Sequence, residues 1–239
     1  MPLQFLLLWA VAPLTLGAVA VTLISIRRRA AQPTLTRTET WVISLIGSGA
    51  MLTVLGGAWG VVATAMSGFG DNPLQVRKMP FWGGPVDAVA DEAAIAASGY
   101  ETVWLDVLDV PAGARWLLYI EASLPSVAAV AIGVAVAWLS LTLLRERPFT
   151  SALPHAIGVA AIAVMVAGVG SQVAGAFGRA LVVDYLGNAS VTTDDGAGAL
   201  AYFTLGLDLA PIGWAFGLAL VAAAFQIGTR MQRETELLV

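Results

Sequence analysis

Long runs of apolar residues constrain this chain more than any other feature of its sequence. A helix rises about 1.5 Å per residue and the hydrocarbon core of a bilayer is about 30 Å thick, so roughly 20 apolar residues can cross it. Five runs reach that length, at residues 5–26, 41–66, 122–144, 154–178 and 200–226. The pattern predicts an all-α integral membrane protein built as a bundle of five transmembrane helices.

The overall composition agrees with this prediction and excludes several kinds of site. Only 12% of the residues are charged, whereas soluble domains carry about 25%. The chain has no cysteine and a single histidine, His155. Disulfides, thiolate nucleophiles, bis-histidine haem and multi-histidine metal sites are therefore excluded within one chain. We expect neither a cofactor nor a metal.

The distribution of positive charge predicts the orientation in the membrane. Three arginines, residues 27–29, follow the first apolar run, whereas a signal peptide carries its positive charges before the run. We therefore expect an uncleaved span with the N-terminus outside and the C-terminus in the cytoplasm. Alternation along the chain then places eight of the twelve Lys and Arg residues inside and twelve of the sixteen acids outside, as the positive-inside rule requires.

The predicted spans divide the chain into three parts. These are two N-terminal transmembrane helices with a basic cytoplasmic loop (1–66), an extracytoplasmic cap (67–121), and three transmembrane helices with a short cytoplasmic tail (122–239).

The cap has a secondary-structure pattern of its own. Residues 86–98 carry apolar side chains at helical spacing. Residues 103–110 are rich in β-branched and aromatic types, 111–114 form a turn signal, and 115–120 could return as a second strand. We expect a β-hairpin here. In the alternative, the chain runs from Trp116 directly into the third span. The outer loop at 179–199, which contains Val182, Val183, Tyr185, Val191 and Thr192, could add a strand to the same cap.

Asp208 is the one acid that falls well inside an apolar run. A carboxylate at membrane depth is costly, so its presence suggests a functional site. Gln172 and Ser171, in the outer half of the fourth run, would be its hydrogen-bond partners. In the alternative, the last helix begins near Pro211 and Asp208 lies close to the outer interface.

Other candidates are weaker. His155, at the inner end of the fourth run, could be a proton switch but is better explained as an interfacial residue with a satisfied hydrogen bond. Ser48, in Gly47-Ser48-Gly49, could be a nucleophile but is better explained by close helix contact. Because no set of nucleophile, base and orienting group is visible, we do not expect an enzyme. No basic patch is large enough to predict direct nucleic-acid binding.

Two stretches resemble a known family. One is Leu144-Arg-Glu-Arg-Pro-Phe-Thr150, and the other is the ending from Ala224 to Val239. Both are similar to bacterial membrane proteins grouped as the domain-of-unknown-function 2975 family, which have a Pro-Phe-Thr turn between the middle spans and an acidic tail after the last. The resemblance covers about residues 40–239. The first span is extra, and Met231 stands where leucine is usual.

The resemblance implies a multi-pass protein of the bacterial inner membrane, with no established activity. Some family members are encoded beside small helix-turn-helix regulators, which implies a cytoplasmic transcriptional regulator as partner. Combined with the acidic cap, this leads us to expect a non-enzymatic scaffold, sensor or regulatory partner, in contact with the lipid bilayer and with a protein in the membrane or cytoplasm. The alternative is a small transporter, or an accessory subunit of one, with a polar path near Asp208.

Overall fold

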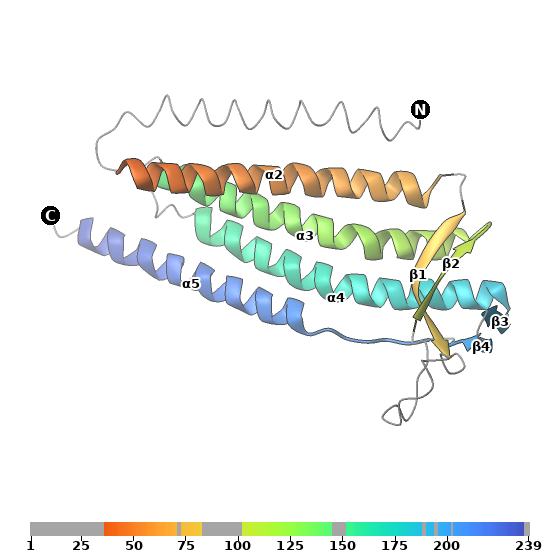
Figure 1. Cartoon of the computed structure of the whole chain (residues 1–239). Helices are drawn as coiled ribbons and strands as arrows, with labels where there is room; N and C mark the ends of the chain where they lie inside the picture. The colour runs from red at the N-terminus through yellow and green to blue at the C-terminus, as the bar shows by residue number, and fades with distance from the viewer. Residues whose placement is uncertain are drawn as a thin grey trace, which may run out of the picture. The chain divides into compact units, whose positions relative to one another are not determined.

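The computed structural model describes residues 36–70, 73–82, 102–144, 152–187, 190–193, 196–201 and 203–236. In chain order its elements are α2 (Arg37–Gly68), β1 (Leu74–Trp82), β2 (Thr102–Val107), α3 (Ala112–Leu144), α4 (Ala152–Leu186), β3 (Ser190–Thr193), β4 (Gly196–Leu200) and α5 (Ala210–Glu236) (Figure 1). The expected first span at 5–26 and the helical pattern at 86–98 lie outside the described residues.

Within these residues, α2, α3, α4 and α5 are each long and apolar enough to cross a membrane. Four of the five predicted spans therefore have a matching helix, and the described part has the composition of a multi-pass membrane protein. Large apolar side chains on α5 agree with this. Trp214 and Leu220 are each 73% exposed and Phe216 is 70% exposed, which is unfavourable in water but not against lipid.

The start of α2 is fixed by a reciprocal capping arrangement. The backbone N–H of Thr36 donates to Glu39 Oε2 at 2.9 Å, and the N–H of Glu39 donates to Thr36 Oγ1 at 3.4 Å. A threonine followed three residues later by a glutamate satisfies two of the donors that a helix N-terminus leaves unpaired.

The described residues form two compact units, and α2, α3 and α4 contribute to both. The helical unit comprises the described parts of Met1–Gly60, Pro125–Gly168 and Leu209–Val239. The sheet unit comprises those of Val61–Leu124 and Val169–Asp208.

In the helical unit, α2 and α3 pack antiparallel through small residues. A Cβ at Gly57 would lie 2.8 Å from the carbonyl oxygen of Ser126, and one at Gly133 would lie 2.9 Å from that of Ala50. Such approaches are possible only without a side chain, and they are typical of helix pairs in membranes. Gly168 makes a similar close contact with Pro211, which joins α4 to the first turn of α5.

The sheet unit has four strands in the order β2-β1-β4-β3, each pair antiparallel. A hydrophobic core joins the sheet to parts of α3 and α4, with members Val76, Met79, Phe81, Val107, Val110, Ala114, Val182, Val183 and Leu200. Met79, Val182 and Val183 are fully buried. This unit therefore has a core of its own, as a water-soluble domain does.

The predicted hairpin between 103–110 and 115–120 is wrong. The first segment does form a strand, β2, but its partner is β1, with Leu74 opposite Val107 and Val76 opposite Leu105. The second segment belongs to α3, whose first turn is marked by the bond from the Arg115 N–H to the Pro111 carbonyl at 3.1 Å. Proline followed by alanine favours a helix start as much as a turn. The alternative, a helix continuous with the third span, is confirmed.

Two other expectations change at the ends of the helices. Val182, Val183 and Tyr185 belong to α4 and not to a strand, whereas Val191 and Thr192 do lie in β3. Val182 and Val183 are β-branched, but apolar residues of a helix can also be buried against a sheet. Their residue type therefore does not determine whether the segment is a helix or a strand.

Candidate functional site

The structure brings Asp208 and Gln172 together through the backbone of Asp208. The N–H of Asp208 donates to Gln172 Oε1 at 2.6 Å, and Gln172 Nε2 donates to the Asp208 carbonyl at 3.0 Å. The side-chain amide thus pairs with both the N–H and the C=O of one residue, as a residue of a neighbouring strand would. These two bonds attach the extended segment 203–209 to α4.

Asp208 is exposed and lies two residues before the start of α5 at Ala210. The alternative in which the last helix begins near Pro211 is therefore confirmed. Ser171 is half-buried beside Gln172 on α4. Of the three residues predicted as a polar site, Gln172 and Asp208 are in direct contact, and Ser171 precedes Gln172 in the chain. Through this contact the Gln172 side chain holds the backbone of Asp208.

His155 and Ser48 lie elsewhere. His155 is exposed in the first turn of α4, about 25 Å along the helix from Gln172 at 1.5 Å per residue. Ser48 is buried, and its hydroxyl donates to the Ser44 carbonyl one turn earlier at 2.8 Å. A Cβ at the neighbouring Gly47 would lie 3.1 Å from the Ser140 Cβ, so Gly47-Ser48-Gly49 belongs to a close helix contact.

A largely buried ion pair in the sheet unit was missed by the sequence analysis. Arg179 Nη1 donates to Glu121 Oε1 at 2.7 Å, with the two side chains 13% and 26% exposed. The sequence predicts Glu121 as the last residue of the cap and Arg179 as the first residue of an outer loop, but α3 and α4 extend past them. Gly175, one turn before Arg179, makes room for the pair, because a Cβ there would overlap the Glu121 carboxylate.

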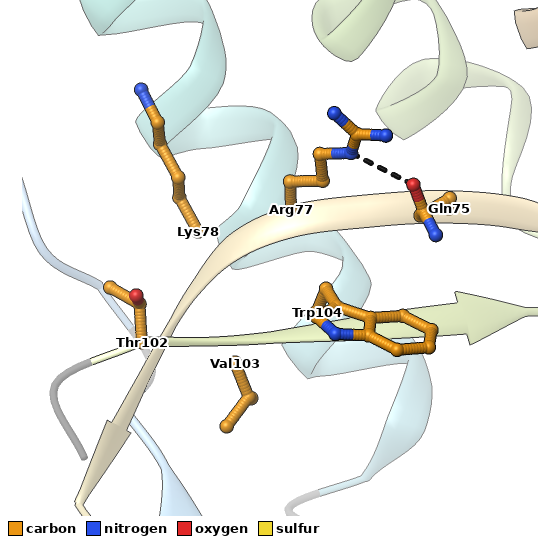
Figure 2. A pocket seen from close by; sticks show the side chains of 6 residues that line it. All are labelled: Gln75, Arg77, Lys78, Thr102, Val103 and Trp104. Atoms are coloured by element: carbon orange, nitrogen blue, oxygen red, sulfur yellow. Dashed lines mark hydrogen bonds between the residues drawn. The ribbon is translucent and has the colours of Figure 1, made fainter.

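The sheet unit has a pocket of about 370 Å³ on β1 and β2, lined by polar, charged and aromatic side chains. Figure 2 shows its six lining residues, Gln75, Arg77, Lys78, Thr102, Val103 and Trp104. Arg77 Nε donates to Gln75 Oε1 at 2.8 Å. Trp104 is 63% exposed.

A β-bulge in β1 places both cations on one face. Val76 pairs with Leu105 and Met79 pairs with Val103, so Arg77 and Lys78 together stand opposite Trp104. In a regular strand two consecutive side chains point to opposite faces, and a bulge breaks that alternation. Both side chains are accordingly exposed between the buried Val76 and Met79.

The pocket is positively charged in an acidic unit. The sequence of the sheet unit carries twelve acids and four bases. Of those bases, Arg179 pairs with Glu121, and Arg115 Nε donates to the Val110 carbonyl at 3.1 Å. Arg77 and Lys78 form no ion pair with any described residue. Across the described ranges, no group of three His, Asp or Glu side chains could hold a metal ion.

Comparison with known proteins adds no identification: no family model, no curated protein and no solved structure matches this chain. The resemblance to the domain-of-unknown-function 2975 family therefore rests on its two motifs.

Proposed function

We propose that this chain is a multi-pass protein of the bacterial inner membrane that acts as a non-enzymatic sensor or scaffold. In this proposal the helical unit crosses the bilayer and the sheet unit faces the extracytoplasmic side as a ligand-binding or partner-binding domain. Two observations support this placement. The sheet unit has its own hydrophobic core, and the sequence ranges 61–124 and 169–208, to which it belongs, contain twelve of the sixteen acids.

The charge pattern of the helical unit supports this membrane placement. Its helical segments at 40–60, 125–144, 152–168 and 210–229 contain no Lys, Arg, Asp or Glu. Their lengths are close to the roughly 20 residues that cross a bilayer. The charges of this unit follow or precede those segments and include eight of the twelve basic residues, which favours a cytoplasmic location for those ends.

A binding role is favoured over transport by the positions of the polar side chains. Gln172 is occupied by the backbone of Asp208, and Asp208 precedes α5. The pocket beside Arg77 and Lys78, by contrast, is open to a ligand. We therefore retain the sensor or scaffold and do not propose the transporter as a second function.

The family resemblance suggests one partner. A small cytoplasmic transcriptional regulator would meet the basic inner loops and the tail after α5. Purification of the native complex in mild detergent would test this, with a chain truncated after Gly228 as the control that lacks the tail. Equal recovery of a regulator with both chains would exclude the tail as its docking element.

Topology reporters test the membrane placement. A reporter active only outside the cytoplasm should be silent when fused after Val239 and active when inserted near Gly99. The reverse result would overturn the orientation. Activity at neither position would argue against a membrane-spanning helical unit.

Reconstitution tests the proposed mode of action. The purified chain in sealed liposomes should give no ion or solute flux above empty liposomes. A flux that disappears on Asp208→Asn substitution would contradict the sensor and favour the transporter.

A further inference from the structure

We propose that the pocket beside Arg77, Lys78 and Trp104 binds a small ligand in which an oxyanion, a phosphate or carboxylate, is joined to a flat apolar group. This inference rests on the proposed function in one respect, namely that the sheet unit is the ligand-binding part. It adds the chemical class of the ligand.

The backbone at Lys78 adopts an unfavourable conformation. Its φ is 56°, in the left-handed region that favours glycine and is costly for other residues. A lysine therefore occupies a position where glycine would be more stable. Strained residues of this kind concentrate at functional sites, where the side chain is needed in that place. Here the bulge directs the ammonium group to the same face as the Arg77 guanidinium, as Figure 2 shows.

The two cations have hydrogen-bond donors that are available to a ligand. Gln75 engages only Nε of Arg77, which leaves both terminal nitrogens to bind an oxyanion. Gln75 also holds the guanidinium in place (Figure 2). Guanidinium groups bind carboxylate and phosphate in a two-pronged geometry, and lysine adds a compact positive charge. Two neighbouring cations without acidic partners among the described residues are therefore suited to an anion.

Trp104 supplies the apolar part of the site. It stands opposite the bulge on the same face of the sheet and is 63% exposed. An exposed indole beside two cations offers a flat surface on which a planar group of the ligand can stack. The pocket volume of about 370 Å³ lies at the small end of ligand sites, so it suits a single ring carrying one anionic group.

Calorimetric titration of the full chain in phosphatidylcholine nanodiscs tests the proposal with phenyl phosphate as the probe. Phenyl phosphate should bind, inorganic phosphate should bind more weakly because it cannot stack, and benzyl alcohol should not bind. Lys78→Gly and Trp104→Leu should each weaken binding by about tenfold, the loss of one charge-assisted contact or one stacking surface.

Two control variants match these changes away from the pocket. Arg230→Gln removes an exposed cation and Trp214→Leu removes an indole that is 73% exposed, and both should bind phenyl phosphate like the parent chain. The Lys78→Gly variant should melt at the same temperature as the parent or higher, since glycine relieves the backbone at this position. Its loss of binding could then not be ascribed to unfolding.

Absence of phenyl phosphate binding by the parent chain would overturn the proposal, as would equal binding by Lys78→Gly and the parent. Nanodiscs containing phosphatidylglycerol distinguish the source of the anion: competition with phenyl phosphate would assign the oxyanion to a lipid headgroup, and its absence would assign it to a soluble ligand. The topology reporters keep the two proposals separate, because an outside sheet unit that does not bind phenyl phosphate would remove only the ligand class.

Discussion

Arg179 on α4 donates a 2.7 Å hydrogen bond to the carboxylate of Glu121 on α3, in the space that the missing side chain of Gly175 leaves open. Both charged side chains are largely buried. An ion pair in such a place stabilises less than its Coulomb attraction suggests, because both groups lose hydration, but loss of one partner leaves the other charge unpaired. The pair therefore fixes how α3 and α4 meet within the sheet unit.

Removal of one partner should destabilise this unit. We expect Arg179→Met to lower the free energy of unfolding by about 2–3 kcal/mol, somewhat less than for a fully buried pair because water reaches part of Glu121. Thermal unfolding in detergent, followed by hydrogen exchange in the sheet unit, measures it. The control is Arg230→Gln, which breaks the exposed pair between Arg230 and Glu234 and should cost at most about 0.5 kcal/mol. Equal costs would contradict the structural role of the buried pair.

Gly175→Ala should disrupt the same ion pair by acting on Glu121. The added methyl group would displace the Glu121 carboxylate, so a loss of about 1–2 kcal/mol is expected. Gly158→Ala, in the same helix with nothing within 4 Å of its added Cβ, should instead stabilise by up to about 1 kcal/mol through helix propensity. In an Arg179→Met background the Gly175→Ala cost should largely vanish, because interacting sites are not additive. Full additivity would separate Gly175 from the ion pair.

The helices were predictable because their signal is long and local. The four apolar runs that fall within the described residues each have a matching helix, since roughly 20 apolar residues in succession have few other stable arrangements. Their ends were not predictable in the same way. The charged residues Glu121 and Arg179 mark the ends of apolar runs in the sequence, but both helices continue past them. At these residues α3 and α4 contact each other through the ion pair, and a single sequence does not display that contact.

Small residues four positions apart on a helix are typical of close contacts between membrane helices, but the spacing alone does not show which residue makes the contact. Gly56 and Gly60 form such a pair in the sequence. A Cβ at Gly60 would lie 2.7 Å from Ser126 Oγ, but one at Gly56 would meet nothing within 4 Å, and one at Gly57, outside the pair, would lie 2.8 Å from the Ser126 carbonyl oxygen. We expect Gly57→Ala to lower stability by about 1–3 kcal/mol through overpacking against Ser126. The neighbouring Gly56→Ala should be neutral or stabilising. Unfolding by SDS in mixed micelles compares the two, and the reverse order would contradict the α2–α3 contact.

The pocket on the sheet could not be inferred from the order of residues alone. Arg77 and Lys78 are adjacent in sequence, which in a regular strand would separate their side chains across the sheet. The bulge that unites them appears only when β1 is paired with β2, and the strand prediction paired β2 with the wrong segment. Asp208 and Gln172, by contrast, were both identified from the rarity of polar groups in apolar runs. Their contact is made by the backbone of Asp208, which Gln172 holds, and the identity of a side chain does not predict a contact made by the backbone.

The contact between Gln172 and Asp208 predicts different effects for substitutions at its two residues. Because Gln172 bonds the N–H and the carbonyl of Asp208, Asp208→Asn preserves both bonds and should change stability by less than about 0.5 kcal/mol. Gln172→Leu removes both and should cost about 1 kcal/mol, limited by water that reaches the exposed segment.

Hydrogen exchange at the Asp208 amide resolves the two substitutions. Its N–H donates to Gln172 Oε1 at 2.6 Å, so exchange should accelerate about tenfold in Gln172→Leu, the rate equivalent of about 1.4 kcal/mol of local opening. It should stay unchanged in Asp208→Asn. Acceleration in Asp208→Asn instead would mean that the carboxylate itself holds the segment. The charge of Asp208 would then regain the importance that its place in an apolar run first suggested, and the transporter hypothesis would have to be reconsidered.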